Sequence, residues 1–307
     1  SVTLSGVKAL IEERTHRVER ESATAITQYK EEVSRQTLYP QMLDGSLGAE
    51  PCSISDLEPT FVEGLEYASG LRDLPEVGNL PAQVDRFFGR KKQLNVLRQR
   101  VADGNRLLTL KGPGGMGKTR LSQVFGAENR STFPGGVWFC DLTEARTEDE
   151  ILRTVANTLG VVLSEDKPVG QLTHAIHGRG RMLLILDNLE QVVDYASSTV
   201  GIWVRNAPDA VFLVTSRIRL GLQGEYLFVL DPLTLDEAIQ LFEDRAQRTR
   251  PDFTLSSESR EVVGDIVERL DRMSLPIELA AARVALLTPQ QILERLSQRF
   301  RLLKSRR

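Results

Sequence analysis

Short apolar runs recur through the centre of the chain and predict buried β-strands. Five of them lie near residues 107–111, 136–141, 182–186, 211–215 and 226–230. The run at 182–186 is apolar at every position, which is typical of a parallel strand covered on both faces. After the first run, helical spacing places Leu121, Val124 and Phe125 on one face. This alternation of strands and helices predicts an α/β domain with a parallel sheet over residues 83–231.

The hydrophobic pattern changes to a helical period after the last predicted strand. Thr234 is a suitable helix N-cap. Two apolar stripes follow at helical spacing: Leu235, Ala238, Ile239, Leu241 and Phe242, and then Val262, Val263, Ile266, Val267 and Leu270. Residues 232–307 are therefore predicted to form a small all-helical domain.

The first 82 residues form a third region with a different composition. They hold 14 acidic and 7 basic residues, whereas the whole chain has a net charge of −3. Residues 7–36 are highly charged with widely spaced apolar positions, which predicts an exposed helix or a partner-dependent coiled coil. Residues 39–78 are rich in Pro, Gly, Ser and acidic residues, so we interpret them as a linker.

Residues 112–119, Gly-Pro-Gly-Gly-Met-Gly-Lys-Thr, match the phosphate-binding loop G-x-x-x-x-G-K-[ST]. A predicted strand precedes the loop and a helix follows it, as the motif requires. Lys118 is expected to reach the β- and γ-phosphates, and Thr119 supplies a hydroxyl for Mg²⁺. A glycine-rich turn without a ligand is the alternative. The candidate nucleotide-binding residues of this segment are Gly112, Gly114, Gly115, Gly117, Lys118, Thr119 and Arg120.

An acidic residue at the end of a later strand completes the predicted site. Asp187 follows the apolar run at 182–186, at the carboxyl end where ligands bind in open α/β sheets. We predict that Asp187 and Thr119 hold Mg²⁺. Asn188 stands where many hydrolytic phosphate-loop proteins carry a second acid, so slow hydrolysis is expected. Glu190 is a further catalytic candidate beside Lys118 and Asp187, although it could also be a solvated first-turn Glu.

A fixed cation follows the fourth strand. Residues 210–214 run into Thr215-Ser216-Arg217, so Arg217 lies at the same predicted sheet edge as the phosphate loop. Its guanidinium could hold an oxygen of the γ-phosphate through two hydrogen bonds. A surface Arg without a ligand is the alternative.

Taken in order, these motifs resemble the STAND class of signalling ATPases, in particular the NB-ARC-like domains of bacterial AfsR- and LuxR-type regulators. The similarity covers about residues 79–303. Its motifs are Arg86-Phe87-Phe88-Gly89-Arg90, the phosphate loop, Asp187-Asn188-Leu189-Glu190, Thr215-Ser216-Arg217, residues 218–225 and Leu275-Pro276-Ile277-Glu278-Leu279-Ala280-Ala281-Ala282-Arg283. The resemblance implies that Arg90 and Pro276 also bind the nucleotide. It differs at Arg272 and Ser274, where the family usually has Gly-x-Pro.

The leading hypothesis is an ATP/ADP-binding switch with slow hydrolysis and Mg²⁺ as cofactor, within a larger regulator. A DNA-associated AAA-type remodelling ATPase is one alternative. A nucleotide-free interaction scaffold is another, favoured by Arg272 and Ser274.

Composition adds limits on partners. The small net charge gives no global attraction to nucleic acid. No apolar run reaches the length of a membrane span, and the two cysteines give no disulfide framework, so a cytoplasmic protein is expected. Other protein partners, or self-association, are expected to involve domains outside this chain.

Overall fold

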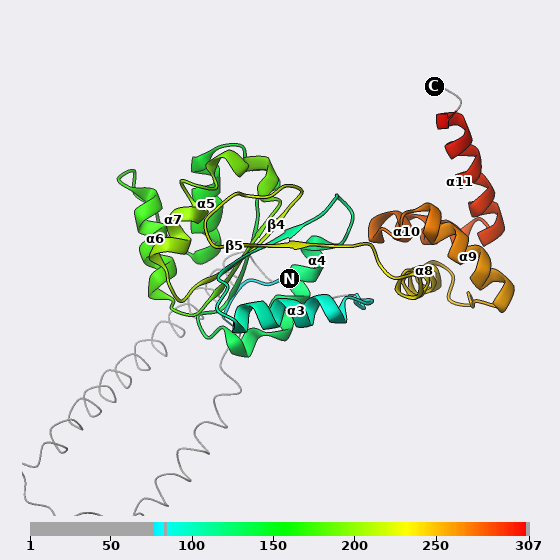
Figure 1. The fold of residues 1–307 in the computed structure, drawn as a ribbon, viewed down its shortest axis with the longest axis horizontal. Helices are drawn as coiled ribbons and strands as arrows, with labels where there is room; N and C mark the ends of the chain where they lie inside the picture. Colours follow the sequence, from blue (N-terminus) through cyan, green and yellow to red (C-terminus); the bar gives the residue numbers. More distant parts are fainter. Residues whose placement is uncertain (1–76, 83–84, 305–307) are drawn as a thin grey trace, which may run out of the picture. The chain divides into compact units, whose positions relative to one another are not determined.

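The computed structural model describes residues 77–82 and 85–304, and the side chains as far as residue 298 (Figure 1). These residues belong to one compact unit, Pro75–Arg307. The predicted charged helix at 7–36 and nearly all of the predicted linker lie outside the described residues. None of the helices in the described ranges is long and apolar enough to cross a membrane.

A five-stranded parallel sheet forms the centre of the α/β part. Its order is β2-β3-β4-β1-β5, so β1 lies between β4 and β5. The strands are β1 (Leu107–Lys111), β2 (Val137–Asp141), β3 (Leu183–Asp187), β4 (Val211–Ser216) and β5 (Glu225–Val229). Each predicted strand is present, with its ends shifted by at most one residue. The predicted fold class is confirmed.

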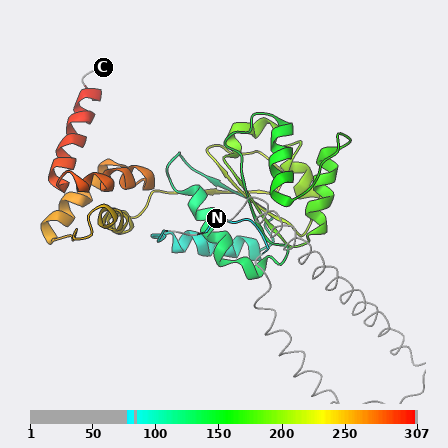
Figure 2. The same cartoon turned by 180° about the vertical axis from the view of Figure 1, so that it is seen from behind.

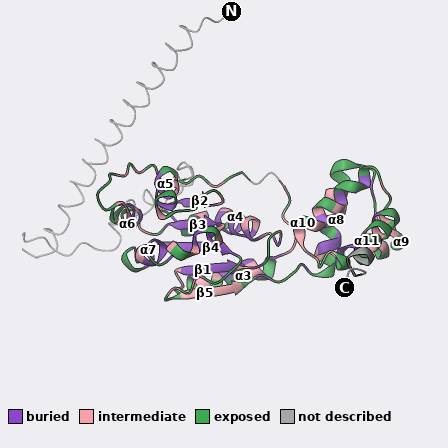
Figure 3. Cartoon of the chain, turned by 90° about the horizontal axis from the view of Figure 1, so that it is seen from above, coloured by how far each residue is buried: buried purple, intermediate pink, exposed green. Residues whose placement is uncertain are grey.

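Helices cover both faces of this sheet, as Figures 1 and 2 show. They are α3 (Lys91–Ala102) and α4 (Lys118–Glu128) on one face, and α5 (Glu148–Leu159), α6 (Pro168–Gly178) and α7 (Val200–Asn206) on the other. Side chains of β3 alternate between the two cores, with Leu184 and Leu186 in one and Leu183 and Ile185 in the other. Buried residues therefore run along the inner strands (Figure 3). This double burial explains why β3 is apolar without alternation.

Residues 77–79 extend the sheet at β2, although residues 77 and 78 fall in the predicted linker. Gly78 forms a parallel bridge with Val137. The side-chain amide of Asn79 donates to Phe139 O at 2.8 Å, and Phe139 N donates to Asn79 Oδ1 at 2.6 Å. Gly78 has φ 140°, and a Cβ at this position would lie 2.0 Å from Val137 O. Only glycine fits this close approach.

Residues 235–304 are helical, as predicted. They comprise α8 (Leu235–Thr249), α9 (Ser257–Arg269), α10 (Ser274–Ala281), a short 3₁₀ turn (Ala282–Ala285) and α11 (Pro289–Lys304). Both predicted apolar stripes pack into one core around Phe242, Ile266 and Ile277, except for Leu235 at the start of α8, which is exposed. Thr234 is the N-cap of α8, as expected, and forms a capping box with Glu237.

The turn between α9 and α10 has an unusual backbone. Asp271 and Arg272 have φ values of 53° and 52°, in the left-handed region that glycine adopts without a Cβ penalty. Arg272 O also accepts a hydrogen bond from Leu233 N at 3.1 Å, which fixes the turn. Arg272 therefore has a glycine-like backbone at the position where the resemblance implies Gly. For a residue with a Cβ, this conformation costs about 1–2 kcal/mol of conformational free energy.

Candidate functional site

The phosphate loop connects β1 to α4 and leaves the start of that helix open. Gly117 precedes the first helical residue with φ 84°, and no side chain caps the helix. Gly115 also has a positive φ of 79°. These conformations need glycine, and they expose the first amides of α4 toward the cavity. An uncapped helix N-terminus of this kind binds anions through its N–H groups and its dipole.

The Lys118 side chain folds back onto the first residues of its own loop. Its Nζ donates to Gly112 O at 2.9 Å and to Pro113 O at 3.0 Å. The side chain is buried, and this burial lowers the pKa of the ammonium, while the nearby Glu190 carboxylate opposes the shift. An entering phosphate would give this charge a stronger acceptor than two neutral carbonyl oxygens.

Asp187 and Thr119 meet as predicted. The Thr119 hydroxyl lies 2.8 Å and 2.9 Å from the two Asp187 carboxylate oxygens. Thr215 donates to Asp187 Oδ1 at 2.6 Å. Burial raises the pKa of Asp187, and the hydrogen bonds from the two threonines oppose that rise. Since a hydroxyl has one proton and two lone pairs, Thr119 can donate to Asp187 and still coordinate a cation. The pair therefore fits Mg²⁺.

Asn188 is held in place from three sides. Its backbone is left-handed with φ 61°. Its side-chain amide donates to Thr143 Oγ1 at 2.7 Å and to Asp187 Oδ2 at 3.1 Å, and its backbone N–H donates to Thr215 Oγ1 at 3.0 Å. Sequence reasoning missed Thr143, although its position just past the second predicted strand would place it at this sheet edge.

Arg217 and Glu190 form an ion pair at the edge of the phosphate loop. Arg217 Nε lies 3.0 Å from Glu190 Oε1, and the Arg217 side chain is 63% exposed whereas that of Glu190 is 11% exposed. A Cβ added to Gly114 would lie 3.4 Å from the Arg217 guanidinium. Arg217, the predicted ligand of the γ-phosphate, therefore lies against the loop, and Glu190 is its partner.

Arg90 is a buried link between the phosphate loop and the segment leading into α8. Its guanidinium donates to Asp231 O at 2.5 Å and to Met116 O at 3.3 Å. Its backbone N–H donates to Glu237 Oε1 at 3.1 Å. Burial lowers the pKa of the guanidinium, and the Glu237 carboxylate opposes that shift.

Helix α10 contacts the loop directly. Leu275 N donates to Gly115 O at 3.0 Å, and Ser274 Oγ lies 3.5 Å from Met116 O. Pro276 is absent from the cavity lining described below; it borders another hollow, between α10 and α11. Arg272 is directed toward Glu268, with its Nε 3.7 Å from the carboxylate.

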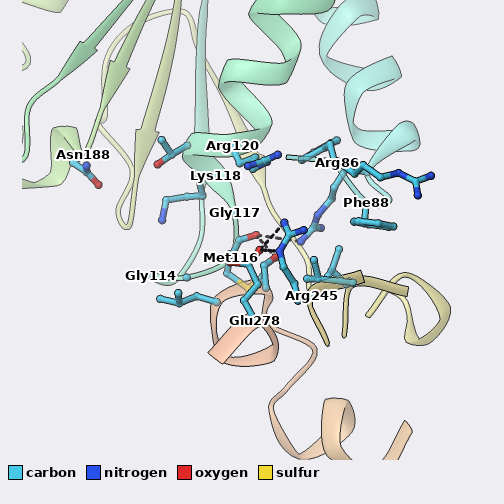
Figure 4. Close-up of a pocket in the computed structure, with 18 of the residues that line it drawn as sticks. Arg86, Phe88, Gly114, Met116, Gly117, Lys118, Arg120, Asn188, Arg245 and Glu278 are labelled. Atoms are coloured by element: carbon cyan, nitrogen blue, oxygen red, sulfur yellow. Dashed lines mark hydrogen bonds and ion pairs between the residues drawn. The ribbon is translucent and has the colours of Figure 1, made fainter. Parts of the chain in front are cut away.

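Most of these groups line one cavity of about 340 Å³, which Figure 4 shows. Arg120 lines it and bonds to Asp85, which also accepts from Arg248 of α8. The cavity brings together most of the predicted site residues with an apolar and charged wall from the helical region. Its lining comprises Arg86, Phe87, Phe88, Arg90, Gly114–Arg120, Asn188, Glu190, Arg217, Leu233, Leu241, Arg245, Ser274, Leu275 and Glu278. A phosphate loop at one end and apolar side chains at the other suit a nucleotide.

The chain is similar to a known domain family and to bacterial proteins. The AAA domain family matches residues 99–215. A protein of Mycobacterium tuberculosis described as uncharacterised is 39% identical over 217 residues, which are 70% of this chain and 55% of that protein. The chain thus spans about half the length of this relative.

Two further relatives are named as regulators. A Mycobacterium tuberculosis protein named as an HTH-type transcriptional regulator is 37% identical over 201 residues, covering 65% of this chain and 22% of the regulator. The regulatory protein AfsR of Streptomyces griseus is 27% identical over 267 residues, covering 80% of this chain and 26% of AfsR. Both similarities span a minor part of a longer protein.

Among solved structures, a Walker-type ATPase of Pyrococcus abyssi has a similar fold. It is 14% identical with a TM-score of 0.52, and the match covers 74% of this chain and 77% of that one. This supports the P-loop fold, and the similarity to AfsR confirms the resemblance to AfsR-type regulators.

Proposed function

We propose that this chain, a STAND-like P-loop ATPase of the type found in AfsR-type regulators, is a nucleotide-controlled switch. It binds ATP or ADP in the cavity beside the phosphate loop, and the bound nucleotide biases the arrangement of helices α8–α11. A ligand shifts such an equilibrium only through contacts that differ between the two states.

The observation that carries this proposal is the direct bonding of the helical region to the phosphate loop. Gly115 O accepts from Leu275 N, and Met116 O accepts from Arg90, whose guanidinium also holds Asp231 O. Because these carbonyls belong to the loop that would wrap the phosphates, a change in loop geometry reaches α10 and the start of α8 without an intermediate element. In other nucleotide switches, too, the γ-phosphate acts by holding a loop that contacts it.

Each charged side chain has a distinct task in this scheme. Lys118 leaves the loop carbonyls and neutralises the β- and γ-phosphates, and the α4 amides donate to the phosphate oxygens. Thr119 and Asp187 would hold Mg²⁺, which when bound neutralises the phosphate charge. Asn188 lacks a basic oxygen, and its amide protons are directed to Thr143 and Asp187.

Arg217→Ala should weaken ATP binding by roughly tenfold to a hundredfold while ADP binding changes little. The reason is that ADP lacks the γ-phosphate, and a charge-assisted hydrogen bond contributes about 1.5–3 kcal/mol. Calorimetry with a non-hydrolysable ATP analogue and with ADP, at matched Mg²⁺ and salt, measures both affinities.

Arg219→Ala is the matched control for this experiment. Arg219 is two residues away, is 62% exposed and pairs with Glu225 at 3.3 Å, so it resembles Arg217 in charge, exposure and pairing. It should leave both affinities unchanged. Equal losses for ATP and ADP in Arg217→Ala would exclude γ-phosphate sensing by this residue.

ATP turnover is expected to stay below about 1 s⁻¹, the low end for ordinary enzymes. Asn188 cannot accept a proton from an attacking water, and Glu190 is engaged by Arg217. Steady-state phosphate release measures this rate. Fast turnover would favour the DNA-associated remodelling ATPase instead, and the absence of any nucleotide binding would favour the interaction scaffold.

The regulator-like relatives suggest the wider setting. We propose that the chain works as the NB-ARC-like ATPase module of a larger transcriptional regulator in the cytoplasm. The signal and the effector then belong to parts beyond this module.

A further inference from the structure

We infer that Glu190 sets the preference of this site for ADP over ATP, because its carboxylate pairs with Arg217 as a γ-phosphate otherwise would. This inference rests on the proposed nucleotide-binding function and names the residue that discriminates between the two nucleotides. Three observations support it.

The first observation is the geometry of the pair. Arg217 Nε is 3.0 Å from Glu190 Oε1, within range of a charge-assisted hydrogen bond. Its guanidinium lies beside Gly114 of the phosphate loop. A carboxylate oxygen therefore already satisfies the cation that would otherwise meet the γ-phosphate.

The second observation is the burial of Glu190. Its side chain is only 11% exposed, although Arg217 is mostly open to solvent. Among the described residues, no donor reaches the buried Glu190 Oε2. An unpaired carboxylate oxygen in a buried position is costly, so Glu190 depends strongly on its single partner.

The third observation is the electrostatic setting. Glu190 lines the same cavity as Lys118. Its carboxylate raises the pKa of the Lys118 ammonium more than the Asp187 carboxylate does, against the larger effect of burial, which lowers that pKa. Glu190 thus supplies negative charge to both cations of the phosphate site. A γ-phosphate can bind Arg217 only after the Glu190–Arg217 pair breaks, whereas the two phosphates of ADP end before that position.

Glu190→Gln tests this inference, because it keeps the size of the side chain and removes its charge. The variant should bind a non-hydrolysable ATP analogue about five- to tenfold more tightly relative to ADP than the unmodified protein does. Glu278→Gln removes the same charge from the same cavity, but its partner is Arg245 rather than Arg217. This control should change ATP and ADP affinity by equal factors.

A double variant shows whether Glu190 acts through Arg217. In the Arg217→Ala background, Glu190→Gln should no longer change the ratio of ATP to ADP affinity. A ratio that shifts equally in both backgrounds would indicate direct repulsion and overturn the inference. So would a loss of ATP affinity in Glu190→Gln, which a nucleotide-binding role for the carboxylate predicts.

The same titrations separate this inference from the proposed function. If the unmodified protein binds neither ATP nor ADP, the proposed function fails. If it binds both and Glu190→Gln leaves their ratio unchanged, only the role of Glu190 fails.

Discussion

Replacing Lys118 with alanine is expected to lower the affinity for both ATP and ADP by roughly 100-fold. The ammonium is a buried cation of the phosphate loop itself, and its present acceptors are the neutral carbonyls of Gly112 and Pro113. Losing a charge-assisted contact to phosphate in a buried site costs about 3 kcal/mol, which corresponds to that factor. Both nucleotides should suffer, because the β-phosphate is common to them. Calorimetry with each nucleotide measures the loss.

The Lys118→Ala protein should unfold no more easily than the unmodified chain without nucleotide. Burial already lowers the pKa of this ammonium, so removing it also removes a desolvation cost. This gain offsets the two lost hydrogen bonds, because Pro113 is exposed and water can replace the donor to its carbonyl oxygen. Lys92→Ala provides the control, since Lys92 lies exposed on α3 and should affect neither binding nor stability. Unchanged ATP affinity in Lys118→Ala would show that the loop is a glycine-rich turn without a ligand.

Arg90→Ala is expected to lower the free energy of unfolding by about 3 kcal/mol. Arg90 is 3% exposed, and its guanidinium bonds to the carbonyls of Asp231 and Met116. Truncation would leave these two acceptors without a donor and open a void, and a buried acceptor left unsatisfied typically costs about 1–3 kcal/mol. Urea unfolding followed by circular dichroism measures the change through the midpoint at constant slope.

Arg98→Ala is the comparison for Arg90→Ala. Arg98 belongs to α3, which begins one residue after Arg90, and pairs with Glu128 at the surface with 39% of its side chain exposed. A surface ion pair contributes about 0–1 kcal/mol, so this loss should be small. Arg90→Lys should be intermediate, because a single ammonium keeps the charge but lacks the fork that spans two carbonyls. Equal effects of Arg90→Ala and Arg98→Ala would contradict a linking role for Arg90.

Local sequence patterns were enough to predict the sheet and the phosphate end of the site. Buried parallel strands need apolar residues on both faces, and the run at residues 182–186 is apolar at every position. The meeting of Thr119 with Asp187 also follows from local information, because the motif defines the loop and a strand end places the carboxylate at the same edge.

The partners of Arg90 and Arg217 could not be predicted in the same way. Arg90 contacts Asp231, which is 141 residues away, and Arg217 pairs with Glu190 from a different strand end. Such pairings depend on side-chain direction and on how the segments pack, which periodicity does not describe. The pairing of Gly78 with β2 was missed for a related reason, since a single bridge leaves no periodic pattern. The nucleotide contact of Pro276 stays a prediction.

The hydrogen bond from Leu275 to Gly115 has an evolutionary consequence. Both of its atoms belong to the backbone, so every amino acid except proline at position 275 can supply the donor. Nearby side chains can then diverge while this connection between loop and helix is inherited unchanged. Arg272 and Ser274 are examples, since they stand where the resemblance to AfsR-type regulators implies Gly and Pro, and the connection is still made. A descendant would lose this contact through a change in the path of the main chain, such as an insertion or deletion in the turn before α10.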